Sequence, residues 1–496
     1  MKSKTIILAF SLLLMAAAVG CGTGGGVILP PTGGNFSNAS LKGSYVYEIH
    51  GFDANFNPYR QIGVFTADGN GNITGGTDDS SVGASGTQVT GTYTVAKDGT
   101  GFILVNTSLG QLNFAITLAS ASEVELIEAD SSLNARGTAQ LQVPSAISAT
   151  LSGTYVFRLH QEISAPNAPN LVPAAEVGSL TISNGSATGA MDETVFGSAA
   201  TATNITATFN APTGLGRGTG TLLDSTTNFT THFVYYIVDT NKFVMLVTNS
   251  GAVGSGSAEL QSGNVGNGLS GNFAFGSRGD DSFAFAGIAT VGQFSAASGA
   301  LSGTEDISQD GTVSSNVAIS SCYGASANGR VVVTDAPGGT CSSTVTQVFW
   351  MVSPSRAFFV NAGNSTVEDG TADLQSTQSF ALSTFTQQYS MAMDGIDASQ
   401  TVVPVGELYS RVGALQFDGK GNLKLNEVVN ASGTGAGVNN PGILAGTYTV
   451  GASGRLVGTL NGGGLNMVMY AVSASEAYVL QTDSGFTTSG KLALQQ

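Results

Sequence analysis

The chain offers few residues that could act as a general base or as a neutral metal ligand. Its 496 residues include three histidines, His50, His160 and His232, and a Ser–His–Asp site or a histidine-containing zinc site would need one of them. His50 and His160 stand at the same offset in two of four internal repeats, where the other two carry Arg278 and Asp394. Because this position accepts His, Arg and Asp alike, we interpret it as a tolerant polar position at a strand end. The sequence therefore predicts no catalytic residue, no metal ligand and no cofactor.

Paired carboxylates could hydrolyse a glycosidic bond, and two adjacent pairs occur, Asp78 with Asp79 and Asp280 with Asp281. Neighbouring residues of a strand point to opposite faces, so neither pair is arranged as an acid and a base. Asp280 also ends an Arg-Gly-Asp tripeptide of the kind that integrins recognise. We place this tripeptide between the first two strands of the third repeat and interpret it as a chance occurrence.

The segment from Asp68 to Asn72 resembles the start of a calcium-binding loop. Such a loop needs glycine at its sixth place, where this chain has Ile73, and the equivalent segment of the fourth repeat has Lys420 at the third place. A tight hairpin turn explains both segments without a metal ion.

The N-terminus predicts export. Two lysines precede an apolar run at 6–19, which is too short to span a bilayer and has the length of a secretory signal core. The run ends in Ala18-Val19-Gly20-Cys21, which resembles the lipobox of bacterial lipoproteins, although Leu is commonest where Ala18 stands. The resemblance implies a signal peptide at 1–20, a lipidated Cys21, and a flexible tether within 21–40. An ordinary signal cleaved after Ala18 would instead leave Cys21 as a free thiol.

The other two cysteines agree with export. Cys322 and Cys341 lie 19 residues apart, and in an oxidising compartment such a pair predicts a disulfide. In the chain-entropy model this bridge would contribute about 3 kcal/mol. A metal-binding pair is the alternative, but no neighbouring histidine would complete a set of four ligands. We expect a protein anchored in the bacterial cell envelope by the lipid on Cys21, at the outer membrane, on its periplasmic or surface-exposed face.

Composition excludes one class of partner. Charged residues make up only 10 % of the chain, and 33 acidic against 17 basic residues give a formal net charge of −16. Such a chain repels phosphate backbones, so we expect no nucleic-acid partner. Hydrophobic residues at 42 % are sufficient for sizeable cores.

Four copies of one sequence unit make up most of the chain. The opening Leu41-Lys-Gly-Ser-Tyr45 returns in related form at Leu151, Leu269 and Phe385, so the starts lie 110, 118 and 116 residues apart. A period of this length marks domain-sized repeats. The copies close on related motifs, which are Ala139–Gln142, Ala258–Gln261, Ala372–Gln375 and Ala493–Gln495. The expected domains are 41–143, 151–261, 269–376 and 385–496.

Short alternating runs within each repeat predict β-strands. In the first repeat about eight such runs follow one another, joined by turn residues such as Asp68–Asn72 and Lys97–Gly99. The pattern predicts an all-β protein of four tandem antiparallel meanders, each of about eight short strands and closed as a small barrel. Four β-sandwiches are the alternative.

Three of the predicted strands are apolar on both faces. They are Phe233–Val238, Phe243–Val247 and Val348–Val352. A strand of a solvated barrel should expose one polar face, so we expect these strands to be covered by a neighbouring repeat. A partner or a ligand is the alternative cover.

The repeats carry a short motif with a known relative. Gly43-Ser44-Tyr45, Gly153-Thr154-Tyr155 and Gly271-Asn272-Phe273 resemble the Gly-x-Trp motif of the calycin group, which includes lipocalins and avidins. That resemblance implies eight-stranded barrels that hold small apolar ligands. The fourth repeat has Gln387 in place of the glycine. Over the whole mature chain, the sequence also resembles large Gly-rich tandem-repeat lipoproteins of environmental bacteria.

Together these observations predict a lipid-anchored, extracytoplasmic, non-enzymatic protein. It would present its four domains to a polysaccharide, a protein or a surface, as a binding or structural module. A carrier of small apolar molecules inside the barrels is the first alternative, although small eight-stranded barrels are by default filled by their own side chains. A glycan-acting hydrolase that uses scattered carboxylates is the second.

Overall fold

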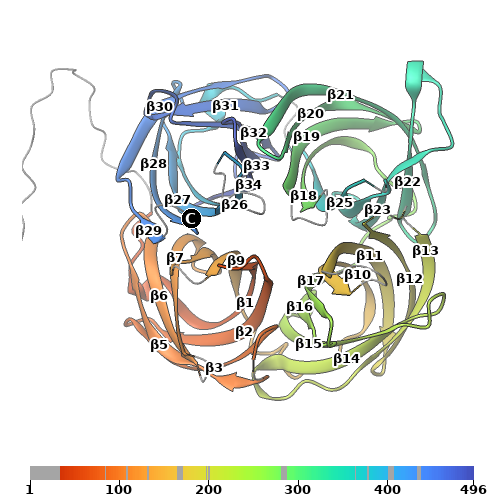
Figure 1. Cartoon of the computed structure of the whole chain (residues 1–496), viewed down its shortest axis with the longest axis horizontal. Coiled ribbons are helices and arrows are strands. Elements are labelled where there is room, and N and C mark those ends of the chain that lie inside the picture. Colours follow the sequence, from red (N-terminus) through yellow and green to blue (C-terminus); the bar gives the residue numbers. More distant parts are fainter. Residues whose placement is uncertain are drawn as a thin grey trace, which may run out of the picture.

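The computed structural model describes residues 34–83, 85–107, 110–130, 133–164, 171–196, 198, 201–280, 287–363, 365–376, 379–399, 407–432 and 437–496. The expected signal peptide, Cys21 and the first part of the tether lie outside these residues. The described chain forms four β-barrels arranged as a ring around a central axis (Figure 1). Within these ranges the helices are single 3₁₀ turns, and none has the length and apolarity to cross a membrane.

The first and second barrels follow the chain order as meanders. The first contains β1 (Lys42–Asp53), β2 (Pro58–Asp68), β3 (Asn72–Ser80), the short β4 (Thr87–Gln88), β5 (Thr90–Val95), β6 (Thr100–Thr107), β7 (Gly110–Ser120), β8 (Glu123–Glu128) and β9 (Leu133–Leu141). The second contains β10 (Gly153–Ser164), β11 (Leu171–Ser183), β12 (Ser186–Val195), β13 (Thr201–Phe209), β14 (Arg217–Asp224), β15 (Thr230–Asp239), β16 (Lys242–Val247) and β17 (Ala252–Leu260).

The third and fourth barrels repeat this order. The third contains β18 (Gly271–Asp280), β19 (Gly287–Ala297), β20 (Ala300–Gln309), β21 (Thr312–Ala325), β22 (Arg330–Asp335), β23 (Val345–Ser353), β24 (Arg356–Asn361) and β25 (Val367–Leu374). The fourth contains β26 (Gln388–Asp397), β27 (Glu407–Phe417), β28 (Asn422–Ala431), the short β29 (Gly437–Asn439), β30 (Ile443–Val450), β31 (Arg455–Leu460), β32 (Leu465–Ala471), β33 (Glu476–Gln481) and β34 (Phe486–Leu494).

The prediction of four antiparallel barrels of about eight strands is confirmed. In each barrel the last strand pairs with the first, as β9 does with β1 and β17 with β10. The same closure joins β25 to β18 and β34 to β26. Because each sheet closes on itself, the alternative of β-sandwiches is wrong.

The barrel interiors are filled by hydrophobic side chains. Each barrel encloses one cluster of buried residues, with aromatic rings in contact near its centre. The aromatic residue of the Gly-x-aromatic motif belongs to this filling, and Tyr45 and Tyr155 are at most 2 % exposed. The hydroxyl of Tyr45 donates to the carbonyl of Ala121 at 2.6 Å, and that of Tyr155 donates to Thr240 at 2.6 Å. The motif thus fixes the hairpin between the sixth and seventh long strands, and this structural role does not favour the carrier alternative.

Neighbouring barrels share apolar seams. The first two strands of one barrel pack against the outer faces of two strands of the next, and the fourth barrel packs in the same way on the first. The pairs are β1 and β2 on β15 and β16, β10 and β11 on β23 and β24, β18 and β19 on β32 and β33, and β26 and β27 on β7 and β8. One head-to-tail contact repeated with a rotation that closes produces a ring.

The expectation for the strands with two apolar faces is confirmed. Phe233, Tyr235 and Ile237 of β15 point into the second barrel, while Val234, Tyr236 and Val238 lie in the seam with the first barrel. In β23, Val348, Trp350 and Val352 lie in the seam between the second and third barrels. Packing between repeats therefore covers these strands.

Three of the four seams carry the same polar triad. In the seam of the second and third barrels, Arg330 donates to both carboxylate oxygens of Asp192 at 2.7 and 2.6 Å, and the indole of Trp350 donates to Asp192 at 2.9 Å. The equivalent sets are Asp79 with Arg217 and Tyr236, and Asp306 with Arg455 and Tyr470. The equivalent residues of the fourth seam are Val428, Thr100 and Thr117, read from the strand registers.

The glutamine of each closing motif is a connector between barrels. Its Nε2 donates to a backbone carbonyl of the next barrel, at 2.7 Å from Gln142 to Ile237, 2.8 Å from Gln261 to Met351, 2.7 Å from Gln375 to Ala471 and 2.8 Å from Gln495 to Leu118. Gln495, at the end of the fourth repeat, thereby joins the last barrel to the first. A motif that the sequence presents only as a repeat boundary thus contributes to closing the ring.

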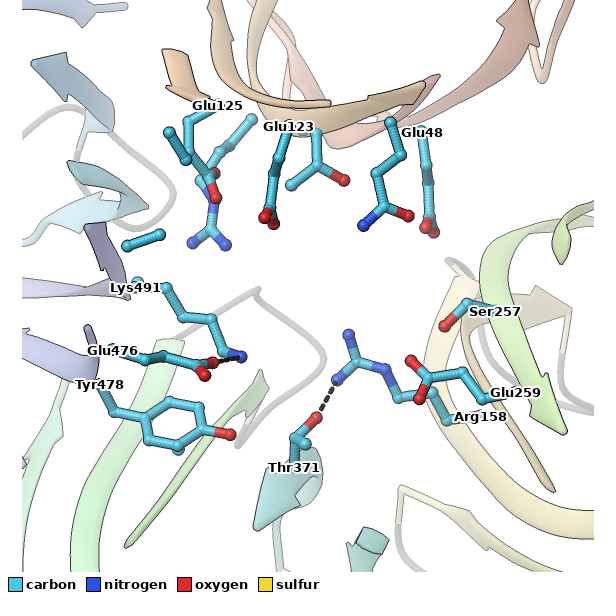
Figure 2. A pocket seen from close by; sticks show the side chains of 18 of the residues that line it. Glu48, Glu123, Glu125, Arg158, Ser257, Glu259, Thr371, Glu476, Tyr478 and Lys491 are labelled. Carbon is cyan, nitrogen blue, oxygen red and sulfur yellow. Dashed lines mark hydrogen bonds and ion pairs between the residues drawn. The ribbon is translucent and has the colours of Figure 1, made fainter. Parts of the chain in front are cut away.

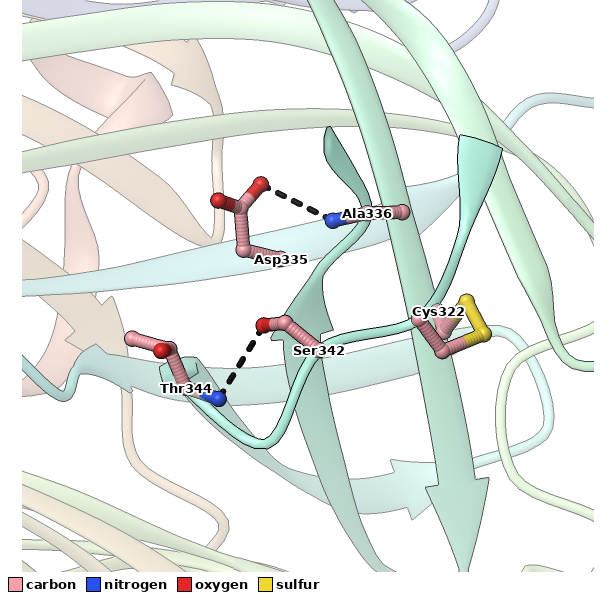
Figure 3. Close-up of a disulfide and its surroundings, with 6 residues drawn as sticks. Cys322, Asp335, Ala336, Ser342 and Thr344 are labelled. Carbon is pink, nitrogen blue, oxygen red and sulfur yellow. Dashed lines mark hydrogen bonds between the residues drawn. A yellow bond between two sulfur atoms is a disulfide. The ribbon is translucent and has the colours of Figure 1, made fainter. Parts of the chain in front are cut away.

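Cys322 and Cys341 form a disulfide in the third barrel (Figure 3). Their Cα atoms lie 5.6 Å apart, and the bridge ties β21 to the loop that follows η3 (Pro337–Gly339). The two thiols are therefore joined to each other, as expected for a chain exported to an oxidising compartment.

Candidate functional site: a charged cavity at the centre of the ring

The ring brings the first and last strands of all four barrels to its centre (Figure 1). Residues at one offset of the four repeats therefore face one another across the axis. His50, His160, Arg278 and Asp394 occupy this offset, since the residues three positions before them pair with Gly63, Gly178, Gly292 and Gly413. This offset does lie near the end of each first strand, but it is more than a tolerant polar position. The four side chains take part in a set of ion pairs around the axis, which we call the girdle and which also includes Arg60, Arg136, Glu162, Asp280 and Asp369.

On one side of the girdle, two arginines and a histidine surround the carboxylate of Asp394. It accepts from Arg278 at 2.5 Å and from Arg136 at 3.2 Å, and His50 Nε2 lies 3.6 Å from it. Burial opposes ionisation of Asp394, but the two guanidinium groups hold its pKa well below the usual range. Burial and Arg278 together lower the pKa of His50 to about 3, so this imidazole is neutral at pH 7.

His160 lies on the other side of the girdle among carboxylates. Its Nδ1 is 2.8 Å from Asp369, and its Nε2 lies 3.8 Å from both Glu162 and Asp280. Burial disfavours the imidazolium, but hydrogen bonding to Asp280 and Asp369 outweighs it and raises the pKa of His160 to about 9.

Among the residues that the structure describes, His160, Glu162 and Asp280 form a group whose possible metal-ligand atoms lie close enough together to hold one metal ion. The buried guanidinium of Arg60 donates to Glu162 at 2.7 Å, and the charge of His160 itself faces Asp280. The protein's own cations thus already neutralise this group.

A cavity of about 810 Å³ lies on one side of the girdle, lined by residues of all four barrels (Figure 2). A much smaller pocket of about 80 Å³ lies on the other side. Both are lined by His50, Arg60, His160 and Arg278, so the girdle separates the two spaces. The large cavity is polar and contains both signs of charge.

One wall of this cavity consists of paired charges. Arg356 contacts Glu259 at 2.9 Å and Asp373 at 2.8 Å, while Lys491 contacts Glu476 at 2.7 Å. Arg158, whose side chain is 38 % exposed, lies 3.3 Å from Asp369. These cations reach the cavity with their charges already balanced by neighbouring carboxylates.

The opposite wall belongs to the first barrel and carries Glu48, Glu123 and Glu125 (Figure 2). Among the described residues, none of the three is in an ion pair with a lysine or an arginine. Glu125 is only 3 % exposed, and its Oε2 has no hydrogen-bond partner. Burial raises the pKa of Glu125 to about 7, although the charges of Arg136 and Lys491 oppose this shift.

The structure places the other residues singled out in the sequence away from the cavity. Asp78 points into the first barrel, where Gln61 donates to it at 2.7 Å, whereas Asp79 points out into a seam. This confirms that the two carboxylates face opposite ways; Asp281 lies outside the described residues. His232 is exposed on β15.

The segment that begins at Asp68 is the hairpin turn that we expected. Asp68 accepts from the backbone of Asn70 at 2.6 Å and of Asn72 at 3.0 Å, and the equivalent Asp418 accepts from Lys420 and Asn422. We expected the Arg-Gly-Asp tripeptide to lie between two strands, and this is wrong. The tripeptide forms the end of β18 and faces the axis.

Sequence reasoning missed the acidic wall. Glu123 and Glu125 are separated by one residue and so share a face of a strand, which is a signal present in the sequence. That signal does not distinguish a face turned to solvent from one turned to an enclosed cavity, and the ring decides between them.

Comparisons with known proteins give no assignment. No model of a known protein family matches the chain, and no curated protein matches it. Among solved structures, the intact Ap-TbpB with its N and C lobes matches at 8 % identity with a TM-score of 0.18, over 75 % of this chain and 84 % of that one. The isotype 1 transferrin binding protein B of serogroup B Neisseria meningitidis matches at 8 % identity with a TM-score of 0.18, over 75 % and 83 %. Likeness of this degree does not establish a shared fold.

Proposed function

We propose that the protein is a lipid-anchored, extracytoplasmic binding protein that holds a polar ligand in the cavity at the centre of the ring. The observation that carries this proposal is a cavity of about 810 Å³ to which all four barrels contribute. Ligand sites typically occupy 300–1,000 Å³ and lie between domains, with a few polar groups that fix the ligand. The anchor rests on the motif Ala18-Val19-Gly20-Cys21.

Binding without chemistry agrees with the protonation states of the girdle. A general base or acid acts best when its pKa lies near the working pH. The pKa of His50 is about 3 and that of His160 about 9, so neither imidazole exchanges a proton readily at pH 7. His160 instead joins β10 to β25 of the next barrel through Asp369 at 2.8 Å, whereas Nε2 of His50 makes no hydrogen bond.

A cavity-filling variant tests this proposal. Thr138 stands between Glu48 and Glu125 in one cross-strand row of the cavity wall, so Thr138→Trp would occupy the space. The full chain, extracted in detergent, is screened by thermal shift against cationic, neutral and anionic solutes of the cell envelope. We expect at least one solute to raise the Tm, and Thr138→Trp to abolish that shift.

Thr206→Trp is the matched control, because Thr206 is exposed on β13, and it should keep the shift. A shift that survives in Thr138→Trp would contradict a central site. Turnover of a bound glycan that is lost in Glu125→Gln would favour a hydrolase and contradict the non-enzymatic proposal.

A further inference from the structure

We propose that the ligand of the central cavity is a linear polyamine, a flexible molecule with several ammonium groups, and that Glu48, Glu123 and Glu125 bind these groups. This inference rests on the proposed function and names the ligand class of the same site. It follows from three features of the cavity: which charges are paired, which polar atom is buried without a partner, and how the carboxylates are spaced.

Charge pairing across the cavity is unequal. Arg356, Lys491 and Arg158 each have a carboxylate partner within 3.3 Å. The girdle cations Arg136 and Arg278 share Asp394, and Arg60 is paired with Glu162. Lys242 also lines the cavity and lies 3.9 Å from Glu259. Of the described carboxylates that line the cavity, Glu48, Glu123 and Glu125 are those without an ion pair to a lysine or an arginine. The acidic wall is therefore the part of the cavity where carboxylates have no ion pair, and it calls for cationic groups on a ligand.

Glu125 supplies a separate indication of a ligand. It is 3 % exposed and lines the cavity, and its Oε2 makes no hydrogen bond. A buried carboxylate oxygen without a donor costs free energy unless something binds to it. In Figure 2 the side chain of Glu125 points into the cavity beside that of Glu123, so an ammonium group in the cavity can reach both.

The spacing of the three carboxylates favours an extended ligand over a single ion. Glu48 and Glu125 both stand opposite Thr138, on the strands that flank β9, which separates them by about 10 Å across the sheet. Glu123 is two residues from Glu125 along β8, about 7 Å away. One divalent ion holds its oxygen ligands at about 2.0–2.6 Å and cannot span such distances. In a polyamine, ammonium groups joined by three or four methylenes lie about 5–6 Å apart.

The rest of the molecule supports this choice. A net charge of −16 creates a field that draws cations toward the protein. On the other side of the cavity the carboxylates beside Arg158, Lys491 and Arg356 are already in ion pairs, so the acidic wall is where ammonium groups would bind. A cavity of about 810 Å³ is also far larger than an ion requires.

Calorimetric titration of the full chain with spermidine, at low ionic strength, tests the inference. We expect one molecule to bind and the Kd to rise about tenfold in Glu125→Gln and in Glu48→Gln, because each removes a charge-assisted hydrogen bond. The control is Asp335→Asn, which changes the net charge equally at an exposed residue outside the cavity, and it should leave the Kd within twofold. Calcium should not displace spermidine.

Several results would overturn the inference. They are the absence of spermidine binding, an equal loss of affinity in Asp335→Asn, and displacement of spermidine by calcium. If spermidine fails but another solute binds and Thr138→Trp abolishes that binding, the polyamine is wrong and the proposed function stands. If no solute responds to Thr138→Trp, both fail.

Discussion

His50 and His160 occupy equivalent positions in two barrels, yet their neighbours impose opposite protonation states. His50 lies beside the guanidinium of Arg278, whereas His160 lies beside Asp369 and Asp280. The difference arises because the ring places a residue of another barrel next to each imidazole. The sequence reveals the shared offset but not the neighbour, so the charge of either histidine could not be predicted.

Titration of the two imidazoles by NMR tests these environments. We expect His50 to stay neutral down to a pKa of about 3 and His160 to stay charged up to about 9. The unfolded value is 6.5 for both. His160 therefore contributes stability below pH 6.5 that is lost as the pH rises through about 9, and His50 causes a loss as the pH falls from 6.5 toward 3.

Asp369→Asn removes the carboxylate that faces His160, so it should flatten the alkaline part of the Tm–pH curve. Resonances assigned with His50→Gln and His160→Gln identify the two rings. An imidazole that titrates near 6.5 in the folded protein would contradict its described environment.

At the scale of the elements, the seams hold the barrels together by one recurring contact. Asp192 is 1 % exposed and accepts from both Arg330 and Trp350. Two equivalent seams repeat this arrangement, and the fourth replaces the acid by Val428. The seam that joins the last barrel to the first thus depends on other contacts, including that of Gln495 with Leu118.

Removing the aspartate of one triad should lower the free energy of unfolding by more than an ordinary substitution at the surface does. Asp192→Ala leaves the partly buried guanidinium of Arg330 and the buried indole of Trp350 without their acceptor, and we expect the free energy of unfolding to fall by about 3 kcal/mol. Denaturant unfolding measures it. Asp335→Ala, at an exposed carboxylate, should change it by less than about 0.5 kcal/mol. Equal effects of the two variants would show that the triad does not hold the seam.

The strands, and the strand faces that a neighbour covers, could largely be predicted from the sequence. The alternating runs indicate the strands, and the two apolar faces of Val348–Val352 indicate a covering neighbour. Ring closure could not be predicted, because the pattern does not say which barrel covers which face. The acidic wall could not be predicted either. Glu48 and Glu123 lie 75 residues apart in the sequence, and the sheet brings them to the two sides of β9.

At the scale of the whole molecule, four similar barrels enclose one cavity that none of them contains alone. Equivalent positions carry different residues in the four repeats, such as His50, His160, Arg278 and Asp394. The fourfold arrangement of the backbone thus surrounds an asymmetric distribution of charge. This asymmetry lets one wall of the cavity be acidic while the opposite wall is paired.

The proposed anchor predicts where the protein is found. Cys21→Ser removes the thiol that would receive the diacylglycerol, so the variant should lose incorporation of a labelled fatty acid and leave the membrane fraction. Cys322→Ser is the control, since it breaks the disulfide and should keep the label. Labelling that persists in Cys21→Ser would exclude the lipoprotein assignment.

Native mass spectrometry of the full chain, isolated gently from its natural host, tests most directly whether the cavity binds a ligand. We predict a bound mass that is lost on denaturation and that is missing from Thr138→Trp but present in Thr206→Trp. A bare mass in the unaltered protein, or a bound mass that persists in Thr138→Trp, would contradict a binding site at the centre of the ring.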